Sequence, residues 1–498
     1  MPQEWERFEK QVRRIHTLGS VSSVLGWDQE TQMPSKGATA RGEHSALIAG
    51  IAHEALTCSE MADSIAALNE ADDLSATRQT VLRETAREHH RAVKVPQSLV
   101  EELSRVRVLS TEAWRVARGE DDFAYFAPHL ARIVALKCEV ADHVGYASHR
   151  YDALLDEYEP GATCASVTEM FAPFRGEARD LLDAVLGSEA APPTSILRRP
   201  LSVDAQRRFC RAAAADLGFD FDAGRLDISA HPFCSGFHPQ DVRLTTRYDE
   251  NEPLSSFFGT LHETGHGLYE QGLPAEHAFT PMGAAVSLGV HESQSRLWEN
   301  LVGRSRPFWS LYLPRLQTCY GGAFDDVSLD DMLFAANAVT PSLIRVEADE
   351  LTYNFHILLR FELEAALIGG DVPIEDLPGA WREGMETYVG IAPENDADGV
   401  LQDVHWSHGL FGYFPTYTLG NLYAAQLFAA IRRDVDDVDG HIAKGDFGSI
   451  LDWLRTHIHG YGMQYGAAEL IERATGEAPT AEYLITYLRE KLTPLYDL

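Results

Sequence analysis

Positive charge is scarce in this sequence, and lysine most of all. The 498 residues include 75 acidic and 42 basic side chains, for a formal net charge of −33, and only six of the basic residues are lysines. This charge disfavours nucleic acids and anionic membranes as partners. A GC-rich genome exchanges lysine for arginine but adds no acids, so we expect a halophilic protein, adapted to a salt-rich cytoplasm where ions screen carboxylate repulsion. An ordinary acidic protein is the alternative.

Long apolar runs and closely spaced cysteines are absent as well. No stretch of 18 apolar residues suggests a membrane span, and the charged segment from Met1 to Lys10 has no apolar core of the kind found in secretory signals. The six cysteines are far apart, without the paired spacing of a zinc ribbon or a disulfide framework. Reduced thiols in the cytoplasm, with no membrane partner, are the simplest interpretation.

The first part of the chain has the pattern of successive amphipathic helices. Apolar residues recur at helical spacing from Leu74 to Ala92 and from Leu99 to Gly119, with short polar breaks between such stretches. Residues 1–186 therefore form an N-terminal helical region. Residues 187–202 are rich in proline and small side chains and predict a surface linker, after which residues 203–498 follow. The length suffices for one large domain.

The segment from His262 to His266 has the pattern HExxH. On a helix, residues four apart lie one above the other, so His262 and His266 can offer two ring nitrogens to one metal ion. Glu263 lies beside them, where its carboxylate can act as a general base toward water on the metal. The helix is supported by apolar residues at spacings of three and four, namely Leu254, Phe257, Phe258 and Leu261. Its start is signalled by Asn251 and Pro253, and its end by Gly272 and Pro274.

A third ligand is needed for a metal site, because two histidines on a helix can equally be partners in a core hydrogen-bond network. Glu292 lies in a second segment with helical periodicity, residues 285–303, and would complete two histidines and one glutamate with an open fourth position. A three-histidine metzincin site is excluded, because this chain has Tyr269 and Gly272 where that pattern requires glycine and histidine. The sequence thus predicts a zinc hydrolase site.

Further polar residues lie around the metal motifs. Arg345 lies in the segment from Ile344 to Asp349, and its usual explanation is a structural ion pair with Glu347 or Asp349. The alternative is a clamp for a substrate carboxylate. Residues 241–248, before the metal helix, alternate apolar or β-branched side chains with polar ones and predict a half-exposed strand. Such a strand is either purely structural or binds an extended peptide as an added strand.

Taken together, the motifs resemble the carboxypeptidase Taq family of metallocarboxypeptidases, over nearly the whole chain. In order, the matching segments are Trp27-Asp28, Met33-Pro34, His231 to Phe233, Asp241 with Arg243 and Thr245, His262 to His266, His291 to Gln294, Ile344 to Asp349, and Gly399 to Trp406. Ordered motifs are far more specific than one pentapeptide. No proposed metal or catalytic position departs from the family pattern.

The resemblance implies a mainly α fold. It would be a single large helical domain over residues 1–498, with a deep active-site cleft and a small β-sheet beside the metal helix, similar to the angiotensin-converting enzyme and oligopeptidase group. Residues 203–498 would be its catalytic region. The resemblance also implies removal of single residues from the carboxyl ends of peptides with broad preference, zinc as cofactor with cobalt as a substitute in some members, and a cytoplasmic homodimer.

Roles for the metal-site residues follow from the resemblance and the spacing together. His262, His266 and Glu292 would hold the zinc ion. Glu263 would take the proton of the attacking water and pass it to the leaving amine.

Three further residues are candidates for contact with the substrate. His405 and Tyr417 are candidate donors to the oxyanion of the transition state, and Arg345 is the candidate for the substrate carboxylate. Weaker candidates, which can equally be packing residues, are His231, Arg243 and Tyr413.

Two other functions remain open. An endo-acting zinc oligopeptidase would use the same metal chemistry. A carboxypeptidase would lose activity when the carboxyl end of the substrate is blocked, whereas an endo-acting enzyme would not. A non-catalytic acidic scaffold with the same fold is opposed by the intact Glu263 beside both histidines.

Overall fold

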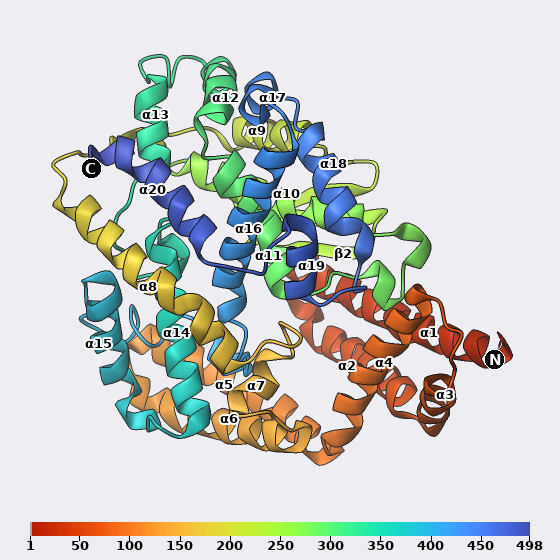
Figure 1. Ribbon diagram of the computed structural model, residues 1–498. Helices are drawn as coiled ribbons and strands as arrows, with labels where there is room; N and C mark the ends of the chain where they lie inside the picture. The colour runs from red at the N-terminus through yellow and green to blue at the C-terminus, as the bar shows by residue number, and fades with distance from the viewer. Residues whose placement is uncertain (1) are drawn as a thin grey trace.

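A computed structural model describes residues 2–498, which form twenty α-helices and one small sheet (Figure 1). The helices before the sheet are α1 (Pro2–Thr31), α2 (Ala38–Thr57), α3 (Ser59–Asn69), α4 (Ala76–Lys94), α5 (Gln97–Glu120), α6 (Phe123–Val144), α7 (Arg150–Leu155), α8 (Cys164–Gly187) and α9 (Val203–Asp216). The strands are β1 (Gly224–Ile228), β2 (Cys234–His238) and β3 (Asp241–Thr246). The helices after the sheet are α10 (Pro253–Gly272), α11 (Leu288–Arg296), α12 (Arg306–Cys319), α13 (Leu329–Ala336), α14 (Thr352–Gly369), α15 (Leu377–Val389), α16 (Pro415–Asp434), α17 (Val438–Lys444), α18 (Gly448–His457), α19 (Ala467–Thr475) and α20 (Glu482–Tyr496). The predicted mainly α fold with a small sheet is confirmed.

Local signals in the sequence set the ends of the predicted helices. Helix α4 begins after Ser75, whose hydroxyl accepts a hydrogen bond from the backbone N–H of Arg78, an otherwise unpaired group of the first turn. Helix α10 begins at Pro253 and ends at Gly272, as predicted. Proline is tolerated at the first helical position because its missing N–H would have no partner there.

The sheet has the strand order β1-β3-β2, with β1 parallel and β2 antiparallel to β3. The predicted strand over residues 241–248 is therefore the central strand, and only the outer strands β1 and β2 could pair with an added peptide. Helix α10 packs against β2 and β3. A Cβ atom on Gly267 would collide with Leu244 of β3, and one on Gly236 of β2 would collide with Glu270 of α10. These close approaches place the metal helix directly beside the sheet.

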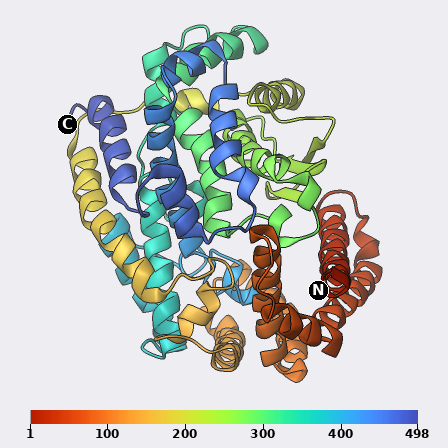
Figure 2. The same ribbon diagram turned by 45° about the vertical axis from the view of Figure 1, so that its right-hand side comes forward.

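Two hydrophobic cores stabilise the molecule. The larger core extends from α5 to α20 and includes the sheet and helices α10, α11, α14 and α16. The smaller core lies between α1, α3 and α4, with Phe8 and Met61 fully buried in it. Of its buried members, Met282 alone comes from outside these three helices. Figure 2 shows the first helices as a group at one side of the molecule.

Residues 187–202 connect α8 to α9 along the larger core. The segment contains a short 3₁₀ turn, Thr194–Arg198, and buries the side chains of Ile196 and Leu201. The connection runs along the surface, with these two side chains anchored in the larger core.

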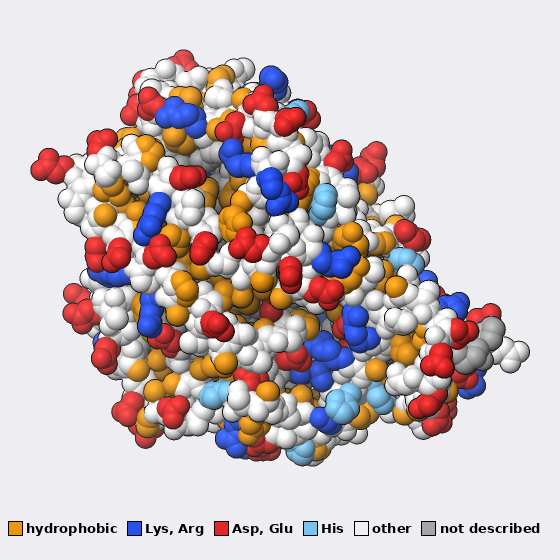
Figure 3. Space-filling model, viewed as in Figure 1, with side chains coloured by type: hydrophobic (Ala, Val, Ile, Leu, Met, Phe, Trp, Pro, Cys, Tyr) orange, Lys and Arg blue, Asp and Glu red, His pale blue; other side chains and the backbone are white. Residues whose placement is uncertain are grey.

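The surface carries the charge excess of the sequence. In the face drawn in Figure 3, acidic side chains are spread widely and basic ones are fewer. Within residues 2–498, no helix has both the length and the apolar character that crossing a membrane would require.

Candidate metal centre

The two histidines of the HExxH segment lie on α10 at a close helix crossing. The ring centroids of His262 and His266 are 4.9 Å apart. Between them in the sequence, Gly265 lies against the backbone of Gln294 and Ser295 in α11, where a Cβ atom would collide. Because glycine permits this approach, α11 comes close enough for its side chains to reach the histidines.

Helix α11 supplies the third member of the group. Its first turn is capped by Ser287, which accepts a hydrogen bond from the N–H of Val290 at 3.1 Å. Glu292 is buried, and α16 crosses it so closely that a Cβ on Gly420 would collide with its side chain. After Arg296 the helix continues as a π-helical segment, Leu297–Val302, which positions Glu299.

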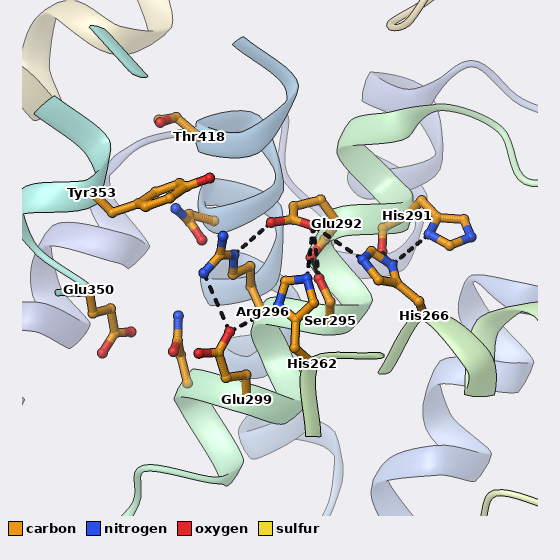
Figure 4. Close-up of polar contacts among 12 residues, drawn as sticks. His262, His266, His291, Glu292, Ser295, Arg296, Glu299, Glu350, Tyr353 and Thr418 are labelled. Atoms are coloured by element: carbon orange, nitrogen blue, oxygen red, sulfur yellow. Dashed lines mark hydrogen bonds and ion pairs between the residues drawn. The ribbon is translucent and has the colours of Figure 1, made fainter. Parts of the chain in front are cut away.

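His262, His266 and Glu292 form a compact donor group, with one ligand atom from each lying within 4.8 Å of the others. The Oε2 atom of Glu292 is 3.6 Å from His262 Nε2 and 3.4 Å from His266 Nε2 (Figure 4). Two imidazole nitrogens and one carboxylate oxygen are the donor set of many catalytic divalent metal sites. The residues therefore fit a divalent metal ion.

The opposite nitrogen of each histidine ring is held by a partner. Nδ1 of His262 lies 2.9 Å from Glu299 Oε2. Nδ1 of His266 lies 3.0 Å from the carbonyl oxygen of His291 and 2.6 Å from Nδ1 of that residue, whose Nε2 lies 2.8 Å from Glu270 Oε1. These contacts place the proton of each ligand ring on Nδ1 and leave Nε2 free for a metal.

Charge and burial set the protonation states of His262, His266 and Glu292. Burial lowers the pKa of His266 to about 3, so its ring is neutral. Burial opposes ionisation of Glu292, but Arg296 and His262 outweigh it and hold the pKa of Glu292 well below its usual range. Burial also disfavours a charged His262, yet Glu292 and Glu299 raise its pKa above the ordinary value. The same two carboxylates would attract a divalent cation.

Glu263 lies on the same helix in a different environment. It is buried, with 6% of its surface exposed, and burial raises its pKa to about 7. A carboxyl group with a pKa near neutrality can both accept and return a proton in the physiological range.

The surroundings of Arg345 differ from the predicted ones. It lies in a 3₁₀ turn, Arg345–Glu347, and not on a helix. Its predicted ion-pair partners are wrong: Glu347 is exposed, and Asp349 accepts hydrogen bonds from the first turn of α14 instead. Arg345 is buried and donates from Nη2 to Asp403 at 2.8 Å, because the segment before His405 folds back over the turn.

The other substrate-contact candidates form one aromatic cluster. The ring of His405 lies 5.6 Å from Tyr413 and 6.5 Å from Tyr417, centroid to centroid. Burial raises the pKa of both tyrosines, and the charge of Glu292 raises each further, which places the cluster within electrostatic reach of the donor group. Tyr353 lies between Arg345 and the neighbour of Glu292, Arg296. Its ring is 4.5 Å from the guanidinium carbon of Arg296 and 5.9 Å from that of Arg345.

The remaining candidates lie on the sheet side. Arg243 donates to Asp241 at 2.9 Å, and its guanidinium carbon lies 4.3 Å from the ring of Trp27 in α1. It therefore joins the sheet to the N-terminal helices. His231 is exposed in the loop between β1 and β2.

Several residues that contact the donor group carried no predicted role as its partners, and Arg296 and Glu299 are the two charged ones on the helix of Glu292 and its continuation. Arg296 contacts Glu292, and Glu299 contacts His262. Their spacing was the available signal, because residues 292, 296 and 299 follow steps of four and three and share one helix face.

The fold and donor group define a class of protein: a mainly helical metalloprotein with an HExxH helix and a glutamate as third donor, as in metal-dependent peptidases. The family model of the carboxypeptidase Taq (M32) metallopeptidases matches residues 7–492. The chain belongs to this family, as its motifs predicted, and is a metal-dependent peptidase of the carboxypeptidase type.

Relatives and solved structures agree with this assignment. Thermostable carboxypeptidase 1 of Thermus thermophilus is 46% identical, covering 97% of each chain, and carboxypeptidase 1 of Bacillus subtilis is 37% identical, covering 98% of this chain and 97% of the relative. The crystal structure of the M32 carboxypeptidase from Deinococcus radiodurans is 37% identical, with a TM-score of 0.97 over 100% of both chains. A structure of Pyrococcus furiosus carboxypeptidase has a TM-score of 0.94 at 37% identity, over 98% of each chain.

Proposed function

We propose that the protein is a zinc carboxypeptidase that removes single residues from the carboxyl ends of peptides with broad preference. The observation that carries this proposal is the group of His262, His266 and Glu292 with the buried Glu263 beside it. A divalent metal in such a group polarises the scissile carbonyl and lowers the pKa of water toward neutrality. Cobalt, which prefers the same kind of donors, is a second candidate ion.

Glu263 is the proposed general base. Its raised pKa of about 7 lets the carboxylate take a proton from the attacking water and then return it to the leaving amine. The neighbouring Glu292 stays ionised because of Arg296, so the two carboxylates have separate roles set by their environments.

His405 and Tyr417 are the proposed donors to the oxyanion. Burial lowers the pKa of His405 to about 3, so its ring is neutral and keeps one N–H to donate. Burial raises the pKa of Tyr417 well above its usual value, so its hydroxyl stays protonated. A neutral N–H and an O–H aimed at developing negative charge are the donors that such a transition state requires.

Arg345 is proposed to bind the free carboxylate of the substrate. It shares Asp403 with Arg360, so two buried guanidinium groups face one carboxylate. Burying a charge without a partner is costly, and the carboxyl end of a peptide would neutralise the excess. In support, the ring of Tyr353 contacts both Arg345 and Arg296, and Arg296 is the partner of the candidate ligand Glu292.

The setting of the enzyme is part of the proposal. The net charge of −33 and the scarcity of lysine support a halophilic protein whose carboxylates are screened by salt in the cytoplasm. Assembly as a homodimer is proposed from the family resemblance.

One assay tests the proposal. The protein is incubated with an amino-blocked dipeptide and with its carboxyl-amidated counterpart, with and without chelator, over a salt series. We expect chelator-sensitive cleavage that strongly favours the free acid over the amidated peptide, with activity lost in low salt. Equal cleavage of both peptides would favour an endo-acting oligopeptidase, and full metal occupancy without cleavage of any peptide would favour a non-catalytic scaffold. Full activity without added salt would contradict the halophilic assignment alone.

A further inference from the structure

One oxygen of the ligand candidate Glu292 is already occupied. Arg296 Nε donates to Glu292 Oε1 at 2.7 Å, one helical turn further along α11. The other oxygen, Oε2, faces the two histidine nitrogens at 3.6 and 3.4 Å and also accepts a hydrogen bond from the hydroxyl of Ser295 at 3.0 Å. Figure 4 shows Arg296 and the histidines on different sides of this carboxylate. The two oxygens of one side chain therefore have different partners.

Arg296 is itself held in place from two further directions. Its Nη1 lies 3.4 Å from Glu299 Oε2, and its guanidinium carbon lies 4.5 Å from the ring centroid of Tyr353. Its side chain is only 15% exposed. A guanidinium group pairs strongly with carboxylates and stacks on aromatic rings, so these contacts oppose its swinging away from Glu292.

A carboxylate can bind a metal ion through one oxygen or through both. If Glu292 used both, the second oxygen would take a position that a catalytic site keeps open for water and the scissile carbonyl. A charge-assisted hydrogen bond from Arg296 occupies an acceptor site of Oε1 and holds that oxygen toward the guanidinium.

We propose that Arg296 is a positioning residue that makes Glu292 a one-oxygen metal ligand and thereby keeps a coordination position free. This inference rests on the proposed metal-dependent function, but it concerns coordination and not the choice of substrate. Arg296 also contacts Glu299, the partner of His262, so a single guanidinium orients a ligand on each of the two helices.

The test uses the cobalt-loaded protein, whose visible absorption is intense for four-coordinate cobalt and weaker for higher coordination. In Arg296→Met, and to a smaller extent in Arg296→Lys, Glu292 is expected to bind through both oxygens, so the absorption weakens at full cobalt occupancy. Arg296→Lys keeps the charge without the planar fork and remains informative if the methionine variant fails to fold. Unchanged spectra in both variants would overturn the proposal.

Two further variants separate this role from a general effect of charge. Arg432→Lys alters an exposed arginine that pairs with Asp439 and not with Glu292, so its cobalt spectrum should match the parent protein. In the double variant Glu292→Gln with Arg296→Met, the amide offers one oxygen, so the four-coordinate spectrum should return. If absorption stays weak in the double variant, the extra donor is not Glu292 and the proposal fails.

Kinetics separate the inference from the proposed function. With the zinc-loaded protein and a blocked dipeptide, the Arg296 variants should lose at least about tenfold in kcat with smaller changes in KM, because an open position is needed in the transition state more than for binding. If the Arg296 variants alter the cobalt spectrum but the parent protein cleaves no peptide, the role of Arg296 stands and the peptidase assignment is rejected.

Discussion

The ring of His262 is fixed by Glu299, whose Oε2 lies 2.9 Å from Nδ1 of the histidine. The other oxygen of this carboxylate accepts a hydrogen bond from Arg304 at 3.1 Å. Burial opposes ionisation of Glu299, but His262 and Arg296 hold its pKa far below the usual range. A charged carboxylate behind a ligand histidine orients the ring and increases the electron density on its free nitrogen.

Replacing Glu299 should therefore weaken metal binding. We expect Glu299→Ala to lower zinc affinity by about 10-fold to 100-fold, since partners of ligand histidines contribute on that scale. Competition with a chromophoric chelator measures the affinity directly. Glu362→Ala, which removes an exposed carboxylate paired with Arg175, is the matched control and should retain the parent affinity. Equal zinc affinity in Glu299→Ala and the control would contradict the orienting role.

Glu263→Gln should separate metal binding from turnover. The amide has nearly the same shape but cannot accept the proton of water, so we expect zinc content at the parent level and a loss of about 100-fold to 10,000-fold in kcat. Elemental analysis and peptide hydrolysis are measured on one preparation. Retained turnover would remove Glu263 as general base.

Arg345→Ala should affect substrates according to their carboxyl end. Loss of a charge-assisted contact should weaken transition-state binding by about 2 kcal/mol, which lowers kcat/KM for a free-acid peptide roughly 30-fold. Residual action on the amidated peptide should change much less. Asp403 keeps Arg360 as a partner at 2.6 Å, which protects the fold in this variant. Equal losses on both peptides would leave Arg345 with a structural role only.

Glu159 should make stability depend on pH. This buried carboxyl group lies at the start of α11, where it accepts hydrogen bonds from the N–H of Gly289 at 3.0 Å and the hydroxyl of Tyr423 at 3.1 Å. Burial raises its pKa to about 7. Between the ordinary carboxyl pKa and this value, the folded chain keeps a proton that the unfolded chain has lost, so the free energy of unfolding falls as pH rises.

The slope from this one group is at most about 1.4 kcal/mol per pH unit. Glu159→Gln cannot ionise and retains an oxygen for Gly289, so its stability should fall less across the same window. Urea unfolding of both proteins at several pH values between about 4.5 and 7 measures the difference. Parallel stability curves would show that Glu159 has the same pKa in the folded and unfolded chains.

Much of the fold was accessible from local sequence signals. Apolar spacing and the residues Pro253 and Gly272 are sufficient to place α10, because helix periodicity and end signals act within a few residues. The strand over residues 241–248 was recognisable for the same reason, but its central place in the sheet was not. Strand order depends on which other segments pair with it, and β1 and β2 have no strong alternation of their own.

The candidate site divides in the same way. The sequence by itself determined the HExxH helix and the family, and it predicted Glu292 as the third donor, because these depend on residue type and spacing. Only the tertiary structure decided which charge neutralises which: Arg345 pairs with Asp403, 58 residues away, and Arg296 pairs with one oxygen of Glu292. Such pairings arise where helices approach closely, as at Gly265, and a buried charge takes whichever partner that packing brings within reach.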